Sequence, residues 1–344
     1  MRRCVVCRRI RFMETRVDIK SYAKINLFLN VLGRRLDGYH EIETILALVE
    51  LSDVISIELA KSGIEFTSDF PGLENFSSSE KEWWVALNHK PEGGGGIQQT
   101  PCLPTKNLIL RAAGEFFRRT GIRAGIKIHL RKRIPIGGGL GGGSSNGAAT
   151  LLGLNRMFGF PLRREELFEI AASLGSDVPF FLCGGVALAK GRGEIIVTLE
   201  GMDKVLDWVV LLLNPGFGIS TPWAFKAYGQ FLGLPNGMQG QASEFIEALK
   251  SGDIHWVAAK LYNSLEKPVL KKYPILELYK DFIISHGGVG ALMSGSGSTV
   301  FGLFEDSVTA AACCDAALSF FGAPTFGVVT RFVMPGSCVD RTSV

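Results

Sequence analysis

The sequence predicts an α+β protein built as two lobes. Segments that alternate like strands are interspersed with segments of helical periodicity, and no repeat of fixed period is present. The 344 residues are enough for one large or two medium domains. We place the boundary near residues 200–204, between an N-terminal domain over residues 18–200 and a C-terminal domain over residues 201–334. Residues 1–17 then form a basic extension and residues 335–344 a tail.

In the first half, Asp18–Val31 alternates as a half-buried strand does, and Asp37–Gly38 marks a turn. Residues 42–57 resume strand-like runs that break at Ser52–Asp53. An insertion or long surface loop is expected over residues 69–105; it is either a plain loop or a substrate lid anchored by Trp83 or Trp84. Further on, the patterns predict a helix over 107–120 ending at Gly121, a strand over 126–130, a helix after Ser144, a helix over 164–174, and strands over 185–190 and 194–199.

The second half begins with a strongly apolar strand over residues 208–213. Ser220 followed by Pro222 is typical of a capped helix start. Residues 263–266, with the sequence NSLE, are expected on a helix surface. The remaining patterns predict helices over 244–249 and 254–261, a segment over 290–293 that leads into a glycine-serine loop, and a strand over 299–304.

Composition excludes several classes of protein. Thirty-seven basic and 33 acidic residues give a net charge of +4, too little to indicate nucleic acid as a partner. The longest apolar candidate, Val205–Leu213, is too short for a membrane span and contains Asp207. Seven scattered cysteines, with Cys4 and Cys7 as a lone CxxC pair, favour a reduced cytoplasmic protein over a disulfide or zinc scaffold. We interpret the arginine-rich residues before Met13 as the result of an upstream translation start before a native Met13, and a transit peptide is the less favoured alternative.

Glycine is in excess, with 42 residues or about 12% of the chain, and it clusters. The densest cluster runs from Gly137 to Gly143 and leads directly into Ser144, Ser145 and an alanine-rich helix. Glycine lets backbone N–H groups face a bound anion closely, and a helix N-terminus adds further N–H groups and a positive dipole end. This arrangement predicts a phosphate-binding loop.

Common nucleotide motifs do not fit this loop. A P-loop needs a lysine where the chain has Ser144. Gly137, Gly139 and Gly142 satisfy GxGxxG, yet the preceding strand does not run into the first glycine and the expected downstream acid is missing. Neither HRD nor DFG of protein kinases occurs. The loop therefore belongs to another kind of nucleotide-phosphate binder.

Two charged residues in apolar surroundings point to chemistry beside that loop. Lys24 lies in the strand SYAKINLFL and Asp177 in LGSDVPFFL, where each needs a partner. A carboxylate can orient a hydroxyl and accept its proton while an ammonium stabilises negative charge. From the residues alone, a phosphoryl-transfer pair and a structural ion pair both remain open.

Together these segments resemble the GHMP small-molecule kinases. The resemblance rests on AKINLFLNV at 23–31, DGYHEIET at 37–44, PIGGGLGGGSSNGAA at 135–149, LGSDVPFF at 174–181 and MSGSGSTVFGLF at 293–304. The DGYH segment beside AKINL is typical of members that act on a cytidine-diphospho methylerythritol in non-mevalonate isoprenoid synthesis. The resemblance implies an N-terminal lobe like a ribosomal-protein domain and a ferredoxin-like C-terminal lobe with the site between them.

The resemblance also implies transfer of the ATP γ-phosphoryl group, with Mg²⁺, to the 2-hydroxyl of that small-molecule substrate, by a monomer or homodimer. It matches Asp177 and Lys24 to the catalytic residues. It matches the ATP-phosphate loop to Pro135, Ile136, Gly137, Gly138, Gly139, Leu140, Gly141, Gly142, Gly143, Ser144 and Ser145. It matches the substrate-binding residues to Asn26, Tyr39, His40, Phe225, Gly295 and Gly297. The metal ligands are unknown, although Ser144 or Ser145 could offer a hydroxyl.

Three alternatives follow from the same residues. Another GHMP kinase, of the homoserine or mevalonate type, would share the loop, a nicotinamide oxidoreductase would use the GxGxxG match, and a silent binding protein would keep only the fold. The insertion, the basic start and Ser176, where many members have alanine, depart from the family pattern.

Overall fold

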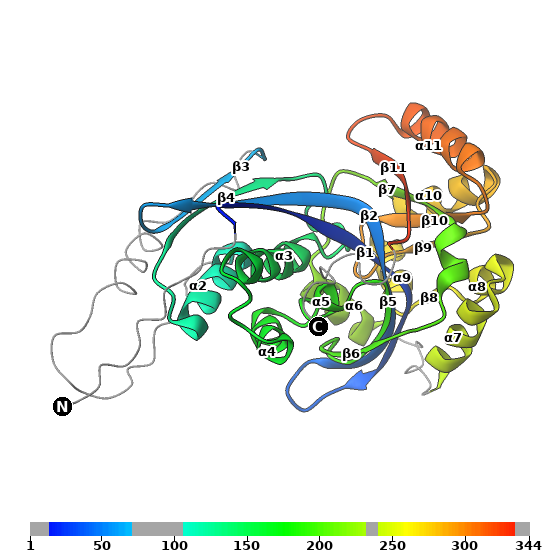
Figure 1. Cartoon of the computed structure of the whole chain (residues 1–344). Coiled ribbons are helices and arrows are strands. Elements are labelled where there is room, and N and C mark those ends of the chain that lie inside the picture. Colours follow the sequence, from blue (N-terminus) through cyan, green and yellow to red (C-terminus); the bar gives the residue numbers. More distant parts are fainter. Residues whose placement is uncertain (1–13, 71–105, 232–239, 334–344) are drawn as a thin grey trace, which may run out of the picture.

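Two β-sheets with helices packed against them form the body of the protein (Figure 1). The computed structural model describes residues 14–70, 106–231 and 240–333. The predictions for Cys4, Cys7, Trp83, Trp84 and nearly all of the insertion fall outside the described residues. No helix in the described ranges is long and apolar enough to cross a membrane.

The first sheet is built on a long antiparallel hairpin of β1 (Arg16–Arg34) and β2 (His40–Ala60). The strand order is β3-β4-β2-β1-β8, with β5 also on β2 and β6 on β5. The other strands are β3 (Ile64–Ser68), β4 (Gly125–Arg131), β5 (Val186–Gly191), β6 (Ile195–Thr198) and β8 (Tyr262–Asn263).

The break expected at Ser52–Asp53 is wrong, because β2 runs through it. The partner of Tyr22 is Ser52 and the partner of Ala23 is Val49, so the hairpin register shifts here as in a β-bulge. A bulge turns the strand without ending it, and here it brings Asp53 beneath the glycine loop, as the contacts below show.

Helices α2 (Leu108–Thr120), α3 (Gly142–Met157), α4 (Arg164–Leu174) and the short α5 (Phe180–Cys183) pack on one face of this sheet (Figure 1). The Asn107 side chain caps α2 by accepting from the Ile109 N–H, and Gly121 ends that helix in the left-handed region at φ 68°. Helix α3 lies close to β2, since a Cβ at Gly153 would come within 2.8 Å of Ile57 Cδ1. The packed face fixes the N-terminus of α3.

The second sheet is antiparallel, with strand order β11-β7-β10-β9. Its strands are β7 (Val209–Asn214), β9 (Gly290–Met293), β10 (Val300–Phe304) and β11 (Phe326–Arg331), and α10 (Ile275–Ser285) and α11 (Ser307–Phe321) pack against it. The other elements are the 3-10 turn η1 (Asp203–Asp207) and helices α6 (Thr221–Gln230), α7 (Gln241–Ser251), α8 (Ile254–Lys260) and α9 (Glu266–Lys272).

The two sheets are joined by segments of the second half that return to the first. Tyr262 and Asn263 pair in parallel with β1, and Phe332 forms a bridge with Val49. Apolar side chains of both sheets, including Ile25, Leu212 and Phe301, share one buried cluster. Residues from both halves of the chain therefore fix the position of one sheet relative to the other.

Candidate active site

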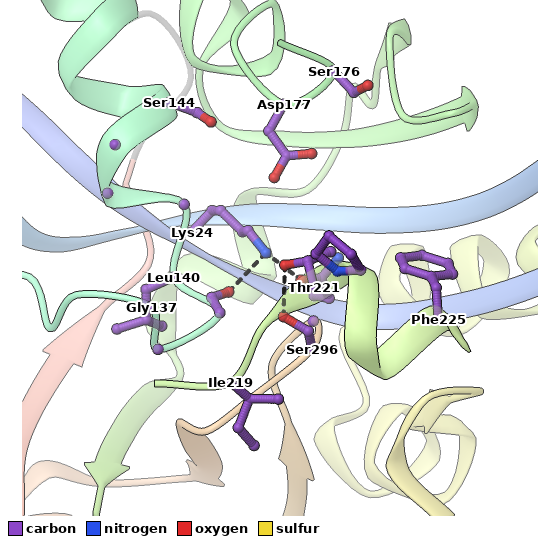
Figure 2. Close-up of a pocket in the computed structure, with 18 of the residues that line it drawn as sticks. Lys24, Gly137, Leu140, Ser144, Ser176, Asp177, Ile219, Thr221, Phe225 and Ser296 are labelled. Atoms are coloured by element: carbon purple, nitrogen blue, oxygen red, sulfur yellow. Dashed lines mark hydrogen bonds between the residues drawn. The ribbon is translucent and has the colours of Figure 1, made fainter. Parts of the chain in front are cut away.

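A cleft of about 1730 Å³ opens where the two halves of the chain meet (Figure 2). It is lined by residues of β1, β2, the glycine loop before α3, helix α6 and the loop after β9. Its cationic side chains are Lys24, Arg34, Lys106, Lys132, Arg192 and Lys226, and among the described lining residues Asp177 is the one carboxylate. This charge balance favours a ligand with several anionic groups.

The glycine loop leads from β4 into helix α3, which begins at Gly142. Gly139 has φ +77°, and an added Cβ there would lie 2.1 Å from the Ser294 carbonyl oxygen. Only glycine therefore allows this loop to touch the loop after β9. The α3 N-terminus opens toward the cleft, which places unpaired N–H groups where an anion can bind.

Asp53 anchors the entry to the glycine loop. Its fully buried carboxylate accepts from the Arg133 N–H at 2.7 Å and the Ile134 N–H at 2.8 Å. It also accepts from the Asn146 amide at 2.9 Å and forms an ion pair with Lys132 at 2.7 Å. Burial lowers the pKa of Lys132, and the Asp53 charge opposes that shift. One carboxylate thus binds both the segment before the loop and the helix after it.

Lys24 lies at the floor of the cleft and is 4% exposed. Its Nζ donates to Asn26 Oδ1 at 2.5 Å and to the Gly139 carbonyl at 2.8 Å. Asn26 in turn donates to Thr44 Oγ1 at 2.9 Å. Burial lowers the pKa of Lys24, and the charge of Asp177 partly offsets this. The ammonium is therefore fixed in place by neutral acceptors.

Asp177 lies between α4 and α5, and its carboxylate points into the cleft above Lys24 (Figure 2). It is half-buried, and a Cβ at Gly193 would lie 3.6 Å from its Oδ1. The predicted Lys24–Asp177 pair thus takes the form of two charges that face each other across open space.

The second glycine loop, residues 294–298, faces the first. Ser294 Oγ donates to the Gly139 carbonyl at 3.0 Å, and Ser296 Oγ lies 3.0 Å from Thr221 Oγ1. Gly295 lines the cleft, whereas Gly297 is packed against Met293, because an added Cβ there would lie 2.7 Å from Met293 Sδ.

Aromatic residues form the other end of the cleft. His40 stacks on Phe225 with ring centroids 5.1 Å apart, and Tyr39 is 56% exposed with the Arg192 guanidinium 4.8 Å from its ring centroid. Burial, followed by the charge of Arg34, lowers the pKa of His40, which favours a neutral imidazole able to donate and accept hydrogen bonds. A flat heteroaromatic ring with a polar edge suits this region.

The two serines after the glycines differ. Ser144 lines the cleft, and its hydroxyl points into it (Figure 2). Ser145 is 2% exposed and accepts a hydrogen bond from Ser21 Oγ at 2.8 Å, so it faces the interior. No group of three or more His, Cys, Asp or Glu side chains that could hold a metal occurs in the described ranges.

The structure brings nearly all the candidate residues to one cleft, with Ser145 and Gly297 outside its lining. The sequence analysis missed Asp53, Lys132 and Arg192. Arg192 carried a usable signal in the sequence, because it lies between two glycines in a turn-like pattern, and the structure places both Gly191 and Gly193 at positive φ. The helix-surface interpretation of residues 263–266 is wrong for its first three members, since Asn263, Ser264 and Leu265 are buried and precede α9.

Comparisons with known proteins agree with this geometry. The pattern of the GHMP kinases N terminal domain matches residues 107–185, and that of the GHMP kinases C terminal domain matches residues 245–323. A 4-diphosphocytidyl-2-C-methyl-D-erythritol kinase of Alkaliphilus metalliredigens is 37% identical over 84% of this chain and 88% of its own length. The corresponding kinase of Caldanaerobacter subterraneus is 38% identical over 85% of this chain and 89% of its own.

Solved structures give the same result. A 4-(cytidine 5'-diphospho)-2C-methyl-D-erythritol kinase superposes with a TM-score of 0.69 at 30% identity, covering 92% of this chain and 99% of its own. A homoserine kinase from Cytophaga hutchinsonii, at 18% identity and a TM-score of 0.66 over 95% of this chain and 98% of its own, shares the fold. The expected two-lobed α+β fold is confirmed. The chain belongs to the 4-diphosphocytidyl-2-C-methyl-D-erythritol kinase family of the GHMP kinases.

Proposed function

We propose that the protein transfers the γ-phosphoryl group of ATP to the 2-hydroxyl of 4-(cytidine 5'-diphospho)-2-C-methyl-D-erythritol. The observation that carries the proposal is the single cleft in which the glycine loop, Lys24 and Asp177 lie at one end and His40 and Phe225 at the other. The names of the relatives supply the identity of the acceptor.

The phosphates of ATP bind at the glycine loop. The N–H groups at the start of α3 meet the phosphate oxygens, and the cations of the cleft balance their charge. Mg²⁺ bound with ATP neutralises charge on the phosphate oxygens. The Ser144 hydroxyl is suited to contribute one ligand, and phosphates and water would supply the rest, since no protein cluster for the metal lies among the described residues.

The transfer step uses the two charges that face each other. The substrate hydroxyl oxygen forms a bond to the γ-phosphorus, the bond from that phosphorus to the bridging oxygen breaks, and ADP leaves. Asp177 orients the hydroxyl and accepts its proton, while the Lys24 ammonium stabilises charge on the oxygens in transit. Asn26 and the Gly139 carbonyl keep the lysine in position.

The cytosine is held at the aromatic end. Tyr39 and Phe225 offer ring faces for stacking, and His40 offers a neutral imidazole to the polar edge of the base. Gly295 of the second loop lies beside Lys24 and Asn26 and covers the acceptor. Gly297 lets the same loop pack closely against Met293.

The proposed domains share this work. The N-terminal domain, residues 18–200, supplies the ATP loop and both catalytic residues, and residues 201–334 supply Phe225 and the second loop. The extension 1–17, the insertion 69–105 and the tail 335–344 lie almost entirely outside the described residues, and the proposed step is built from described residues alone. Every side chain in it comes from one chain, so the proposal holds for a monomer and for a homodimer.

A coupled assay of ADP release with three acceptors tests the proposal: the cytidine-diphospho substrate, homoserine and mevalonate. We expect turnover with the first alone, and a loss of kcat of about 10²- to 10⁴-fold in Asp177→Asn. Ser176→Ala is the matched control, because the neighbouring Ser176 side chain points away from Lys24 (Figure 2). Turnover with another acceptor, tight NAD binding without ATP binding, or an unchanged Asp177→Asn would each contradict the proposal.

A further inference from the structure

Residues 262–265 add a short segment to the edge of the first sheet, exposed at Tyr262 and buried from Asn263 to Leu265. Tyr262 and Asn263 pair in parallel with Phe28 and Leu29 of β1. The Ser264 N–H donates to the Leu29 carbonyl at 2.9 Å, and its Oγ accepts from the Val31 N–H at 3.0 Å. This segment is therefore fixed to the strand that carries Lys24 and Asn26.

The Asn263 side chain reaches from this segment to the second glycine loop. Its Nδ2 donates to the carbonyls of Met293 and Gly295, both at 2.8 Å, and its Oδ1 accepts from the Leu265 N–H at 2.9 Å. The residue is 5% exposed, and both donor hydrogens and one acceptor site are used. One amide thus joins β1 to the start of the loop.

Glu266 makes the second contact to the same place. Its Oε1 accepts from the Met293 N–H at 3.0 Å, and its Oε2 pairs with Lys280 at 2.7 Å. Met293 is consequently bound at its carbonyl by Asn263 and at its N–H by Glu266. Asn263 and Glu266 together therefore hold the residue that precedes the second glycine loop.

The position of the loop matters because it touches the floor of the cleft. Gly295 has φ +56°, and an added Cβ would lie 3.0 Å from Asn26 Oδ1 and 3.2 Å from Lys24 Nζ. Ser294 Oγ accepts from the Asn26 N–H at 3.3 Å and donates to the Gly139 carbonyl at 3.0 Å. A shift of the loop would move the acceptors that hold Lys24.

We propose that Asn263 is a positioning residue for the phosphoryl transfer. Its hydrogen bond to the Gly295 carbonyl fixes how close the second glycine loop lies to Lys24 and Asn26. Glu266 supports this position through its hydrogen bond from the Met293 N–H. Asn263 is not among the residues that line the cleft, so it acts through the loop and not on the substrate. This inference rests on the proposed function, because it concerns the geometry of that same site.

The chain offers a matched control for Asn263. Asn155 is 4% exposed, donates to the Leu162 carbonyl and accepts from the Leu162 N–H, both at 3.0 Å, and is absent from the cleft lining. Asn263→Ala and Asn155→Ala therefore remove the same amide at the same burial, one beside the site and one away from it.

Steady-state kinetics and thermal unfolding of the full chain test the inference. We expect Asn263→Ala to lower kcat by about 10²-fold, the scale of a misplacement of about 1 Å, with the KM for ATP changed less than about twofold. Asn155→Ala is expected to keep kcat within about twofold at a similar loss of Tm. Equal kcat values for the two variants would overturn the inference.

Asn263→Asp gives a readout that loss of stability alone would not give. The ionised carboxylate has no donors and faces two carbonyls, whereas the protonated acid regains one donor. We expect the ratio of its kcat to that of wild type to rise as the pH falls, and a constant ratio would overturn the inference. If wild type itself failed to phosphorylate the cytidine substrate, the proposed function would fail; normal wild-type turnover with a normal Asn263→Ala would sink the positioning role alone.

Discussion

The two glycine loops meet at Gly139 and Ser294, yet they are attached to the protein by different chemistry. The first is tied down by the buried Asp53 carboxylate, which binds a buried lysine, two backbone N–H groups and the Asn146 amide. The second is held at Met293 and Gly295 by the neutral amide of Asn263, with the Glu266 carboxylate on the Met293 N–H. A buried charge is costly to leave unpaired, whereas a lost neutral hydrogen bond costs less. The first loop should therefore be coupled to folding and the second mainly to the geometry of the site.

The largest expected effect is on the anchor of the first loop. Asp53→Asn leaves the Lys132 ammonium buried without its charge partner, and we expect it to lower the free energy of unfolding by about 3–5 kcal/mol. Chemical denaturation measures this change directly.

Two variants make that measurement specific. Asp18→Asn removes an exposed carboxylate paired with Arg16 on the same hairpin, and its expected cost is below about 1 kcal/mol. Asp53→Asn combined with Lys132→Met removes both charges and should recover part of the loss. Similar losses for Asp53→Asn and Asp18→Asn would show that the buried pair is not the anchor.

The contact between the loops is the next place to break. Gly139→Ala puts a Cβ 2.1 Å from the Ser294 carbonyl at a φ of +77°, so the loops must separate; we expect kcat/KM to fall about 10²-fold. Gly121→Ala, outside the cleft, also has a positive φ, of +68°, but open space around the new Cβ, and should change kcat/KM less than about threefold. Equal falls in kcat/KM for the two variants in steady-state assays would mean that the reaction does not depend on the contact between the loops.

This contrast also explains what the sequence could reveal. The first loop was predictable because its glycines directly precede the helix they serve, and its ligand-binding N–H groups are local. Asp53 was not, because a polar residue in a strand looks like a break; only the bulge against Tyr22 shows that β2 continues and carries its carboxylate to Ile134.

The support of the second loop was hidden for a related reason. Asn263 lies 30 residues before Met293 in the chain, so no periodicity connects them, and its segment resembles a helix surface until its pairing with β1 is seen. Lys24 and Asp177 stood out as charges in apolar segments, but their separation across the cleft depends on how the bulged hairpin and α4 pack. Helix α10 and strand β11 carried no motif and were missed.

Lys24, where both loops converge, supplies a pH test. Burial lowers its pKa below the ordinary 10.5, so it loses its proton at lower pH than an exposed lysine, and kcat/KM should fall on the alkaline side with an apparent pKa below 10.5. Lys24→Arg stays protonated and should lack that limb, although its rate is lower. If the alkaline fall in kcat/KM persists in Lys24→Arg, it is caused by the titration of another group.

The lowered pKa of Lys24 also predicts how the stability of the protein changes with pH. Between the folded pKa of Lys24 and 10.5, the unfolded chain binds more protons than the folded chain, so this residue makes the protein more stable as the pH rises through that window. Unfolding free energies of wild type and Lys24→Met at several alkaline pH values isolate the effect. A difference between the two proteins that is constant with pH would contradict it.

The smallest expected effect concerns the ion pair between Glu266 and Lys280, near the second loop. Lys280 is 23% exposed and Glu266 14% exposed, so water already solvates part of this pair, and Lys280→Met should change the free energy of unfolding by less than about 1 kcal/mol while leaving kcat unaltered. Glu266 Oε1 would still accept from the Met293 N–H, which is the contact that fixes the loop.

Measuring the free energy of unfolding and kcat for both Lys280→Met and Glu266→Ala separates the effect of the ion pair from that of the hydrogen bond. Glu266→Ala should lower kcat, because Met293 loses an acceptor; a Lys280→Met loss as large as that of Asp53→Asn would show that both loops depend on ionic anchors and would remove the difference between them.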